Sequence, residues 1–257
     1  MLLAIDIGNS LIKFGVFEDG KLIDKFSIAT KRDYHSDELH FDRLEFTEGK
    51  FLKIDSVVVS TVVPELIDVV RVASQTQFNV TPVFVDQSAD FGLKIEYDPP
   101  NSVGIDRLIN AFAAVHKYGK PVIVCSFGTA TTIDAVNANA EFIGGIIAPG
   151  MKTMSDALHE KAAQLPAVQI EKPLRLIGNS TESAIRSGVF NGHIAMVEGL
   201  VSRFLSDKAV TGSAKKRAKV IATGGFAKLI AKEVKSIDES DENLTLEGLE
   251  LIAGRSS

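Results

Sequence analysis

Cysteine is almost absent from this sequence, since Cys125 is the only one in 257 residues. A single cysteine excludes an internal disulfide and favours a reducing compartment, so we expect a cytoplasmic protein. No apolar run reaches the length of about 18 residues that a membrane-spanning helix needs. The N-terminus also lacks the basic, apolar and small-residue regions of a secretory signal. We therefore expect no membrane partner.

An excess of positive charge is also missing. The net charge is −5, and the one basic cluster is formed by residues 215–217 together with Lys219. Clusters of this kind usually lie in solvated loops, so we expect no nucleic-acid partner. The hydrophobic and charged fractions, 45% and 24%, are ordinary for a globular protein. The length allows one large domain or two domains of moderate size.

The N-terminal stretch, residues 4–17, predicts a short apolar strand, a turn and a returning strand. Asp6 ends the first strand, and a buried acid is costly unless a cation or hydrogen-bond donors face it. The turn at residues 8–10 (Gly-Asn-Ser) offers backbone N–H groups, an amide and a hydroxyl, and Lys13 adds an ammonium group. This combination suits a phosphate group with a divalent ion beside it. The alternative is an ordinary N-terminal hairpin with Asn-Ser in its turn.

The rest of the chain alternates between strand and helix patterns. We expect strands at residues 21–27, 57–60, 83–85, 93–97, 142–148 and 220–226, a second hairpin at 122–134, and helices from 37, from 64, at 104–118, from 150, from a cap formed by Asn179 and Glu182 to Leu205, and at 227–234. A hairpin followed by a third strand thus occurs twice. Two such units, each followed by helices, predict a duplicated α/β fold with a cleft between its halves.

Three glycine-containing turns follow one another along the chain. The first comes after Asp6, the second is residues 128–131 (Gly-Thr-Ala-Thr), and the third is residues 224–225 (Gly-Gly). Facing hairpins can hold a triphosphate from two sides through backbone N–H groups. A double glycine lets the chain come close to a nucleoside. The order of the turns therefore indicates a site for a nucleoside triphosphate.

Several motifs together carry a family resemblance that runs from Met1 to about Ala253. They are Asp6-x-Gly8-Asn9-Ser10-x-x-Lys13, Tyr97, Gly104-x-Asp106-Arg107, Gly128-Thr129-Ala130-Thr131-Thr132, Gly144-Gly145-x-x-x-Pro149-Gly150, Ser180-Thr181-Glu182-Ser183 and Thr223-Gly224-Gly225. The chain resembles the acetate and sugar kinase and actin superfamily, and within it the type III pantothenate kinases. The motif around Asp106 and Arg107, joined with Tyr97 and Thr181, is the most specific part of the resemblance.

The resemblance implies a duplicated α/β fold of the actin-like, ribonuclease H-like kind. Its two domains would comprise residues 1–115 and 116–257, with an ATP cleft between them. The implied reaction is ATP-dependent phosphorylation of pantothenate to 4′-phosphopantothenate, the first step of coenzyme A biosynthesis. Mg²⁺ and a homodimer are implied as well.

The same resemblance assigns residues to the ligands. For ATP it gives Asp6, Ile7, Gly8, Asn9, Ser10, Leu11, Ile12, Lys13, Gly128, Thr129, Ala130, Thr131, Gly224 and Gly225. For pantothenate it gives Tyr97, Gly104, Ile105, Asp106, Arg107 and Thr181. Asp6 is also the residue for Mg²⁺, which it would hold through water because Mg²⁺ gives up its hydration reluctantly.

Asp106 is the implied general base. It lies in the first turn of its expected helix, where the helix dipole favours an ionised carboxylate, and such a group can accept the proton of the substrate hydroxyl. Arg107 can bind the pantothenate carboxylate through two parallel hydrogen bonds. Each residue also has a plainer explanation: Asp106 as a charge at a helix start, Tyr97 as a packing residue and Thr181 as a neighbour of the helix cap.

Three further residues receive structural interpretations. Asp134 is expected to cap its hairpin, and Cys125 is expected to be a small buried hydrophobe. His159 lies on a helix with no pattern around it that indicates a site.

Ser126 departs from the family pattern, which has an acid two residues before the Gly-Thr-Ala motif. In the family this acid contributes to a monovalent-cation site for K⁺ or NH₄⁺. Serine keeps an oxygen ligand but loses the charge, so the sequence leaves two alternatives for cation binding and activity. One reading is an active kinase with altered cation dependence, and the other is a nucleotide-binding regulatory homologue without catalysis. A different small-molecule kinase or phosphatase on the same fold would need another substrate pocket.

Overall fold

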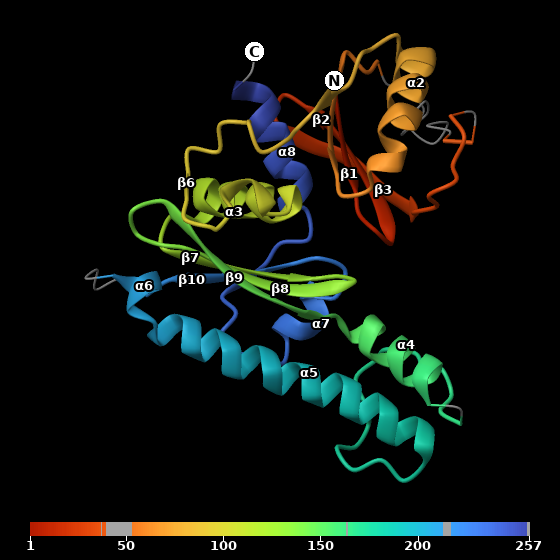
Figure 1. The fold of residues 1–257 in the computed structure, drawn as a ribbon, viewed down its shortest axis with the longest axis vertical. Coiled ribbons are helices and arrows are strands. Elements are labelled where there is room, and N and C mark those ends of the chain that lie inside the picture. Colours follow the sequence, from red (N-terminus) through yellow and green to blue (C-terminus); the bar gives the residue numbers. More distant parts are fainter. Residues whose placement is uncertain (37, 40–52, 163, 213–216, 256–257) are drawn as a thin grey trace. The chain divides into compact units, whose positions relative to one another are not determined.

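The computed structural model describes residues 1–36, 38–39, 53–162, 164–212 and 217–255 (Figure 1). The chain forms two compact units. The first contains residues 1–93, 98–113 and 243–257, and the second contains residues 94–97 and 114–242. The helix expected from residue 37 falls on residues outside the described ranges. The division into domains at residue 115 stays a prediction.

The first unit is built on a mixed five-stranded sheet. Its strands are β1 (Leu2–Ile7), β2 (Leu11–Glu18), β3 (Lys21–Ala29), β4 (Ser56–Thr61) and β5 (Val83–Phe84), in the order β3-β2-β1-β4-β5. Strand β2 is antiparallel to both of its neighbours, β1 and β3, whereas β4 is parallel to β1 and β5 is parallel to β4. The N-terminal hairpin and its third strand are therefore confirmed.

Helix α2 (Ile67–Phe78) packs on one face of this sheet. It follows a 3-10 turn, η1 (Pro64–Leu66), so the helix expected from Pro64 begins as a tighter turn. Ile5 of β1 and Val70 of α2 belong to one buried apolar cluster. Burial of the β-branched and aromatic residues of the hairpin therefore stabilises the packing of this sheet face on α2.

Helix α8 (Leu244–Arg255) packs against β1, β2 and β4 and was not expected from the sequence. A Cβ on Gly15 of β2 would stand 3.1 Å from Leu246 of this helix. Gly15 lies opposite Ala4 of β1, and side chains alternate along a strand. Helix α8 therefore covers the face that carries Ala4 and Asp6, opposite to the face of α2.

The second unit contains a mixed six-stranded sheet. Its strands are β6 (Lys94–Ile95), β7 (Val122–Phe127), β8 (Ala130–Val136), β9 (Glu141–Pro149), β10 (Lys219–Thr223) and β11 (Glu239–Ser240), in the order β11-β10-β7-β8-β9-β6. Strands β7, β8 and β9 form an antiparallel meander, and β10 is parallel to β7. The order β9-β8-β7-β10 repeats the order β3-β2-β1-β4 of the first sheet. The expected duplication is confirmed.

Helices of the second unit pack against this sheet. They are α4 (Met151–Lys161), α5 (Thr181–Ser206), α6 (Lys208–Thr211) and α7 (Ala227–Ala231). Phe127 of β7 and Val189 of α5 belong to one buried cluster. In Figure 1 the long helix α5 runs along the second sheet, and α4 packs beside it.

Helix α3 (Ile105–Tyr118) begins after a second 3-10 turn, η2 (Pro100–Ser102). Within the first unit it packs closely on α8, because a Cβ on Gly248 would stand 2.7 Å from Cγ2 of Ile109. Thr245 also donates a hydrogen bond of 2.8 Å to Oδ1 of Asn110. These contacts hold the start of α3 on the first unit.

Two structural interpretations from the sequence are wrong. The N-cap of α5 is Ser180 and not Asn179, because Ser183 N donates to Ser180 Oγ at 3.2 Å and Ser180 N donates to Ser183 Oγ at 2.9 Å. Asp134 does not cap the second hairpin but lies inside β8, opposite Val124. At the start of α5, the hydroxyl groups of Ser180 and Ser183 each accept the backbone N–H of the other residue, as a capping box requires.

The interpretation of Cys125 is confirmed. The thiol is fully buried on β7, and burial raises its pKa above the ordinary value. His159 of α4 makes a local contact, since its Nδ1 lies 2.8 Å from the carbonyl oxygen of Leu165. Among the described residues, no helix combines the length and the apolar character needed to cross a membrane.

Candidate functional site

Asp6 lies at the end of β1 between two polar partners on neighbouring strands. The register places Lys13 of β2 and Ser60 of β4 opposite it. Lys13 Nζ is 3.4 Å from Asp6 Oδ2, and Ser60 Oγ donates to Asp6 Oδ1 at 3.0 Å. Asp6 is only 7% exposed and Ser60 is 1% exposed. Each oxygen of a nearly buried carboxylate therefore has its own donor, as burial of a charge requires.

The first turn presents polar side chains to solvent. Asn9 and Ser10 are exposed. The carbonyl oxygen of Gly8 accepts a hydrogen bond from Thr30 Oγ1 at 2.7 Å, and that of Ser10 accepts one from Thr30 N at 3.0 Å. Because Thr30 engages these two carbonyl oxygens, the turn is better suited to an anion. Thr30 gave no signal in the sequence.

The glycine amide of the second turn, like that of the first, is bonded inside its own turn, but the bond spans two residues instead of three. Gly128 N donates to Ala130 O at 3.0 Å, as Gly8 N donates to Leu11 O at 3.0 Å. Both amides are thus engaged inside their turns. A Cβ on Gly128 would have Ala130 O at 3.8 Å as its nearest neighbour, which is ordinary contact. The described fold therefore leaves room beside Gly128 for the close approach of another molecule.

Ser126 occupies the position in the second sheet that Asp6 occupies in the first. Each residue stands two positions before its turn glycine. The register places Thr132 of β8 and Thr223 of β10 opposite Ser126. Three hydroxyl-bearing residues therefore meet where the first sheet has a carboxylate, an ammonium group and a hydroxyl.

Gly224 and Gly225 in the third turn differ in what requires them. Gly224 has φ +92°, and a Cβ there would stand 2.5 Å from the carbonyl oxygen of Phe127. Phe226 N also donates to that oxygen at 3.2 Å. Packing on β7 therefore demands glycine at 224. Gly225 is exposed, and a Cβ on it would meet nothing within 4 Å, so the described fold does not require glycine there.

Asp106 is the second residue of α3, and its carboxylate folds back across the helix start. A Cβ on Gly104 would stand 2.7 Å from Asp106 Oδ1. The glycine therefore makes room for this carboxylate. Arg107 follows with only 6% exposure, and its N donates to Gly104 O at 3.1 Å. Ile105 is buried beside them and anchors the helix start.

Tyr97 and Thr181, two expected pocket residues, belong to the second unit. The ring of Tyr97 packs on Gly144, where a Cβ would stand 3.3 Å from Cδ2, and on Phe142, with ring centroids 6.3 Å apart. The packing contact thus exists, and it holds the ring in place. Thr181 is exposed at the first position of α5.

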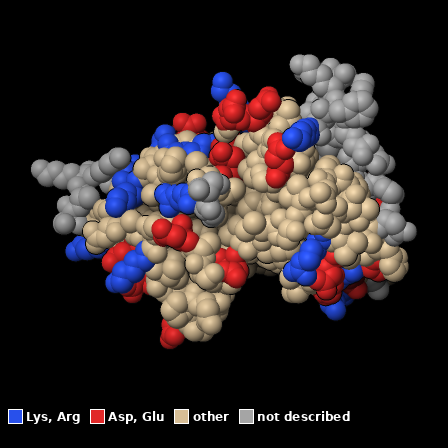
Figure 2. Space-filling model, turned by 90° about the horizontal axis from the view of Figure 1, so that it is seen from above, with Lys and Arg blue, Asp and Glu red and all other residues tan. Residues whose placement is uncertain are grey.

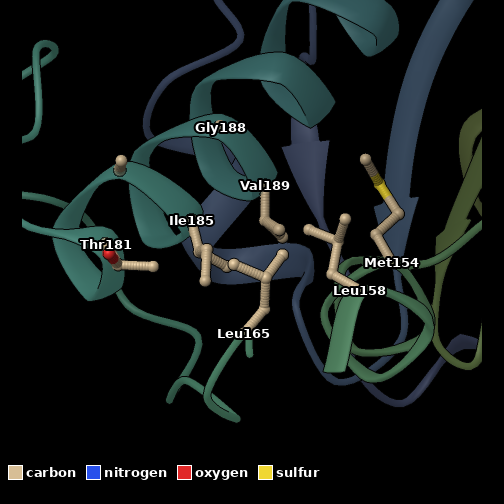
Figure 3. Close-up of a pocket in the computed structure, with 8 residues that line it drawn as sticks. Met154, Leu158, Leu165, Thr181, Ile185, Gly188 and Val189 are labelled. Carbon is tan, nitrogen blue, oxygen red and sulfur yellow. The ribbon is translucent and has the colours of Figure 1, made fainter. Parts of the chain in front are cut away.

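A cavity of about 610 Å³ lies between α4 and α5, and Figure 3 shows its lining. Apolar side chains dominate it, and Thr181 supplies a hydroxyl. The lining residues are Met154, Leu158, Leu165, Thr181, Ala184, Ile185, Gly188 and Val189. Apart from Thr181, none of these residues was expected at a site from the sequence.

Charge is mixed on the visible surface, where basic and acidic side chains alternate (Figure 2). The described members of the basic cluster are each paired with an acid. Arg217 Nη1 lies 2.7 Å from Asp238 Oδ2, and Lys219 Nζ lies 3.4 Å from Glu239 Oε1.

Comparison with known proteins gives a consistent result. Residues 2–203 match the family model described as type III pantothenate kinase. The chain is 42% identical over 261 residues to the type III pantothenate kinase of Acidiphilium cryptum. This alignment covers 99% of this chain and 95% of that protein. It is 40% identical over 255 residues to the type III pantothenate kinase of Halalkalibacterium halodurans, covering 98% of each.

Solved structures share the fold at low sequence identity. A conserved Baf family protein from Campylobacter jejuni has a TM-score of 0.59 at 20% identity, covering 99% of this chain and 98% of that one. The activator of the 2-hydroxyisocaproyl-CoA dehydratase from Clostridium difficile has a TM-score of 0.53 at 11% identity, covering 99% and 94%. The actin-like α/β fold with two mixed sheets is therefore confirmed.

Proposed function

This chain belongs to the type III pantothenate kinases, and from this premise we propose how its residues carry out the reaction. The activity is transfer of the ATP γ-phosphoryl group to the terminal hydroxyl of pantothenate, in coenzyme A biosynthesis. Such transfer depends on positioning and charge stabilisation more than on covalent chemistry by the protein. The observation that carries the assignment of residues is the buried Asp6 carboxylate, held by Lys13 and Ser60 at the end of β1.

The phosphates of ATP bind at the first and second turns. The amides of Gly8 and Gly128 bond inside their turns, so the contacts come from neighbouring backbone N–H groups and from the side chains of Asn9, Ser10 and Thr129. The remaining residues from 6 to 13 and from 128 to 131 shape the two turns. The ammonium group of Lys13 adds charge stabilisation.

The nucleoside of ATP is approached by the third turn. Gly225 is the residue of this turn that lies against the nucleoside, since the fold leaves open space where a side chain at this position would stand. Gly224 supports it by fixing the turn on β7.

Asp6 fits the kind of Mg²⁺ site that kinases use. In the described part of the chain, no group of three or more acidic, histidine or cysteine side chains is placed to hold a metal ion. Mg²⁺ at phosphate sites typically takes one or two carboxylates and completes its shell with water and phosphate oxygens. Asp6 supplies that carboxylate. When bound, the ion neutralises charge on the phosphates.

Asp106 accepts the proton of the pantothenate hydroxyl. The oxygen then attacks the γ-phosphorus, the bond to the β-phosphate oxygen breaks, and ADP leaves. Arg107 binds the pantothenate carboxylate through two hydrogen bonds. Tyr97, Gly104, Ile105 and Thr181 complete the substrate pocket.

A coupled assay of ADP release, with and without pantothenate, tests this function. We expect release that depends on pantothenate. ATP binding without turnover supports the regulatory homologue instead. The serine at position 126, where the family has an acid, favours that alternative. Turnover only with other acceptors indicates a different small-molecule kinase.

We propose that Ser126 weakens the monovalent-cation site of the family. Replacing a carboxylate by a hydroxyl removes one charge from the shell, and two charges about 4 Å apart interact by roughly 4 kcal/mol at an effective dielectric of 20. We expect turnover to respond weakly to K⁺ or NH₄⁺, and Ser126→Asp to give saturable activation at lower concentration. The rate against KCl at constant ionic strength, for both proteins, checks this. Coinciding curves with steep activation would contradict it.

We also propose a homodimer in which a second copy covers the cavity between α4 and α5. Leu174, Leu176 and Ile177 are largely exposed in the segment that leads to α5. Ile177→Asp is expected to give monomers by sedimentation and to raise the KM for pantothenate. Val72→Asp, at an exposed position on α2, is the matched control and should leave the dimer intact. A fully active wild-type monomer at assay concentration refutes the proposal.

A cytoplasmic location and a two-domain division near residue 115 complete the proposal. The single cysteine, Cys125, supports the first, because a chain without an internal disulfide is typical of a reducing compartment. The repeated strand order of the two sheets supports the second.

A further inference from the structure

Thr131 and His193 form a buried contact that the proposed reaction does not use. Thr131 belongs to the second turn segment and is fully buried. It lies opposite Phe127, whose side chain shares a cluster with residues of α5, so Thr131 is on the face toward that helix. Its Oγ1 is 2.8 Å from Nε2 of His193, in the middle of α5.

The proton of the His193 ring can be assigned from its surroundings. The side chain is 1% exposed, and burial lowers its pKa below the ordinary value, so the ring is neutral at pH 7. Its Nδ1 is buried and has no hydrogen-bond partner among the residues that the structure describes. A buried N–H without an acceptor is rarer than a buried acceptor without a donor. We therefore assign the proton to Nε2, which donates to Thr131 Oγ1.

Packing alone does not account for a histidine at this position. The ring of Phe127 meets the imidazole edge to face, with centroids 6.0 Å apart and planes at 71°. A second phenylalanine would make the same contact. It would also avoid burying an unpaired nitrogen, which costs free energy. What only the histidine provides is the hydrogen bond to Thr131.

Helix α5 connects this contact to the proposed pantothenate pocket. Thr181 is its first residue, and at a rise of 1.5 Å per residue His193 lies about 18 Å further along the axis. The reciprocal hydrogen bonds of Ser180 and Ser183 fix the helix start. One continuous helix thus carries a proposed substrate residue and the partner of a proposed nucleotide residue.

We propose that His193 is a positioning residue that fixes the second phosphate turn, residues 128–131, on α5 through Thr131. This inference rests on the proposed role of that turn in ATP binding. The donated hydrogen bond holds the Thr131 side chain in one orientation, and Thr131 holds the start of β8, the strand in which the turn segment ends. The exposed Thr129 is then presented to the phosphates in one direction.

Equilibrium binding of Mg·ADP and steady-state kinetics test the role of His193. His193→Phe keeps the ring packing but removes the hydrogen bond, so the dissociation constant for Mg·ADP and the KM for ATP should each rise about fivefold, with kcat changed less than about threefold. His193→Gln retains a donor and should return both constants to within about twofold of wild type. Thr131→Val should match His193→Phe, and the double variant should be no weaker than either single one.

Val197→Ala is the matched control, because Val197 is buried one turn further along α5 and contacts the same core. It should lower the thermal midpoint without changing the Mg·ADP constant. An unchanged constant in His193→Phe, or a His193→Gln variant as weak as His193→Phe, overturns the inference. If His193→Phe does not fold, Thr131→Val decides by the same constant. Wild-type protein without pantothenate-dependent turnover contradicts the proposed function, whereas the binding constants still test His193.

Discussion

Replacing Asp106 by asparagine is expected to lower turnover by about 100-fold or more, the loss typical when a general base is removed. The amide keeps the size of the side chain and its place across Gly104 but cannot accept the proton of the substrate hydroxyl. Binding of ATP should stay close to wild type, since Asp106 is not one of the proposed nucleotide residues. Steady-state kinetics with a separate nucleotide titration measures both effects.

Asp68 offers a matched control for the plainer explanation of Asp106. It is also the second residue of a helix, α2, and it is paired with Arg71 at 2.7 Å on an exposed surface. If a charge at a helix start were all that mattered, Asp68→Asn and Asp106→Asn would both cost only a few tenths of a kcal/mol of stability. We expect this for Asp68→Asn alone, with unchanged turnover. Asp106→Asn turnover within a few-fold of wild type would rule out the base role.

Asp6→Asn is the second substitution with a large expected effect. It removes the carboxylate proposed for Mg²⁺ while leaving the shape of the site, so we expect kcat to fall by about 100-fold, as when a preorganised charged or polar group is lost. The Mg²⁺ concentration needed for half-maximal rate should rise. Stability should fall by only about 0.5–1.5 kcal/mol, because Lys13 is part-exposed and can turn to water.

Ser60→Ala provides a graded comparison for Asp6→Asn. It removes one of the two donors to the carboxylate but keeps the charge, so we expect a rate loss of no more than about tenfold. Titration of the rate with MgCl₂ should rank wild type, Ser60→Ala and Asp6→Asn in that order. Equal Mg²⁺ dependence in all three proteins would exclude Asp6 as the metal residue.

Local patterns were enough to predict the two hairpins and to group Asp6 with Lys13. A hairpin turn fixes the register of its two strands, so residues on either side of the turn can be related from sequence. Ser60 could not be found in this way. It reaches Asp6 across 54 positions of sequence, and the parallel pairing of β4 with β1 depends on the whole sheet.

The cap of α5 shows a different limit of sequence reasoning. Asn179 with Glu182 and Ser180 with Ser183 have the same spacing, and both patterns are suited to a helix start. Only the backbone conformation at Ser180, extended with φ −143°, decides between them. Helix α8 was missed because Leu244 and Leu246 alternate as in a strand and Gly248 interrupts the helical period.

Gly248 nevertheless explains how α8 fits where it does, since a side chain there would collide with Ile109 of α3. The close fit of α8 has a consequence for synthesis on the ribosome. Strands β1 to β5 emerge early, but the helix that covers their Asp6 face is translated only after residues 114–242. Residues 114–242, by contrast, are complete before α8 appears. Since a domain folds as a unit once its parts are available, the unit whose sequence starts first is the one that finishes folding second.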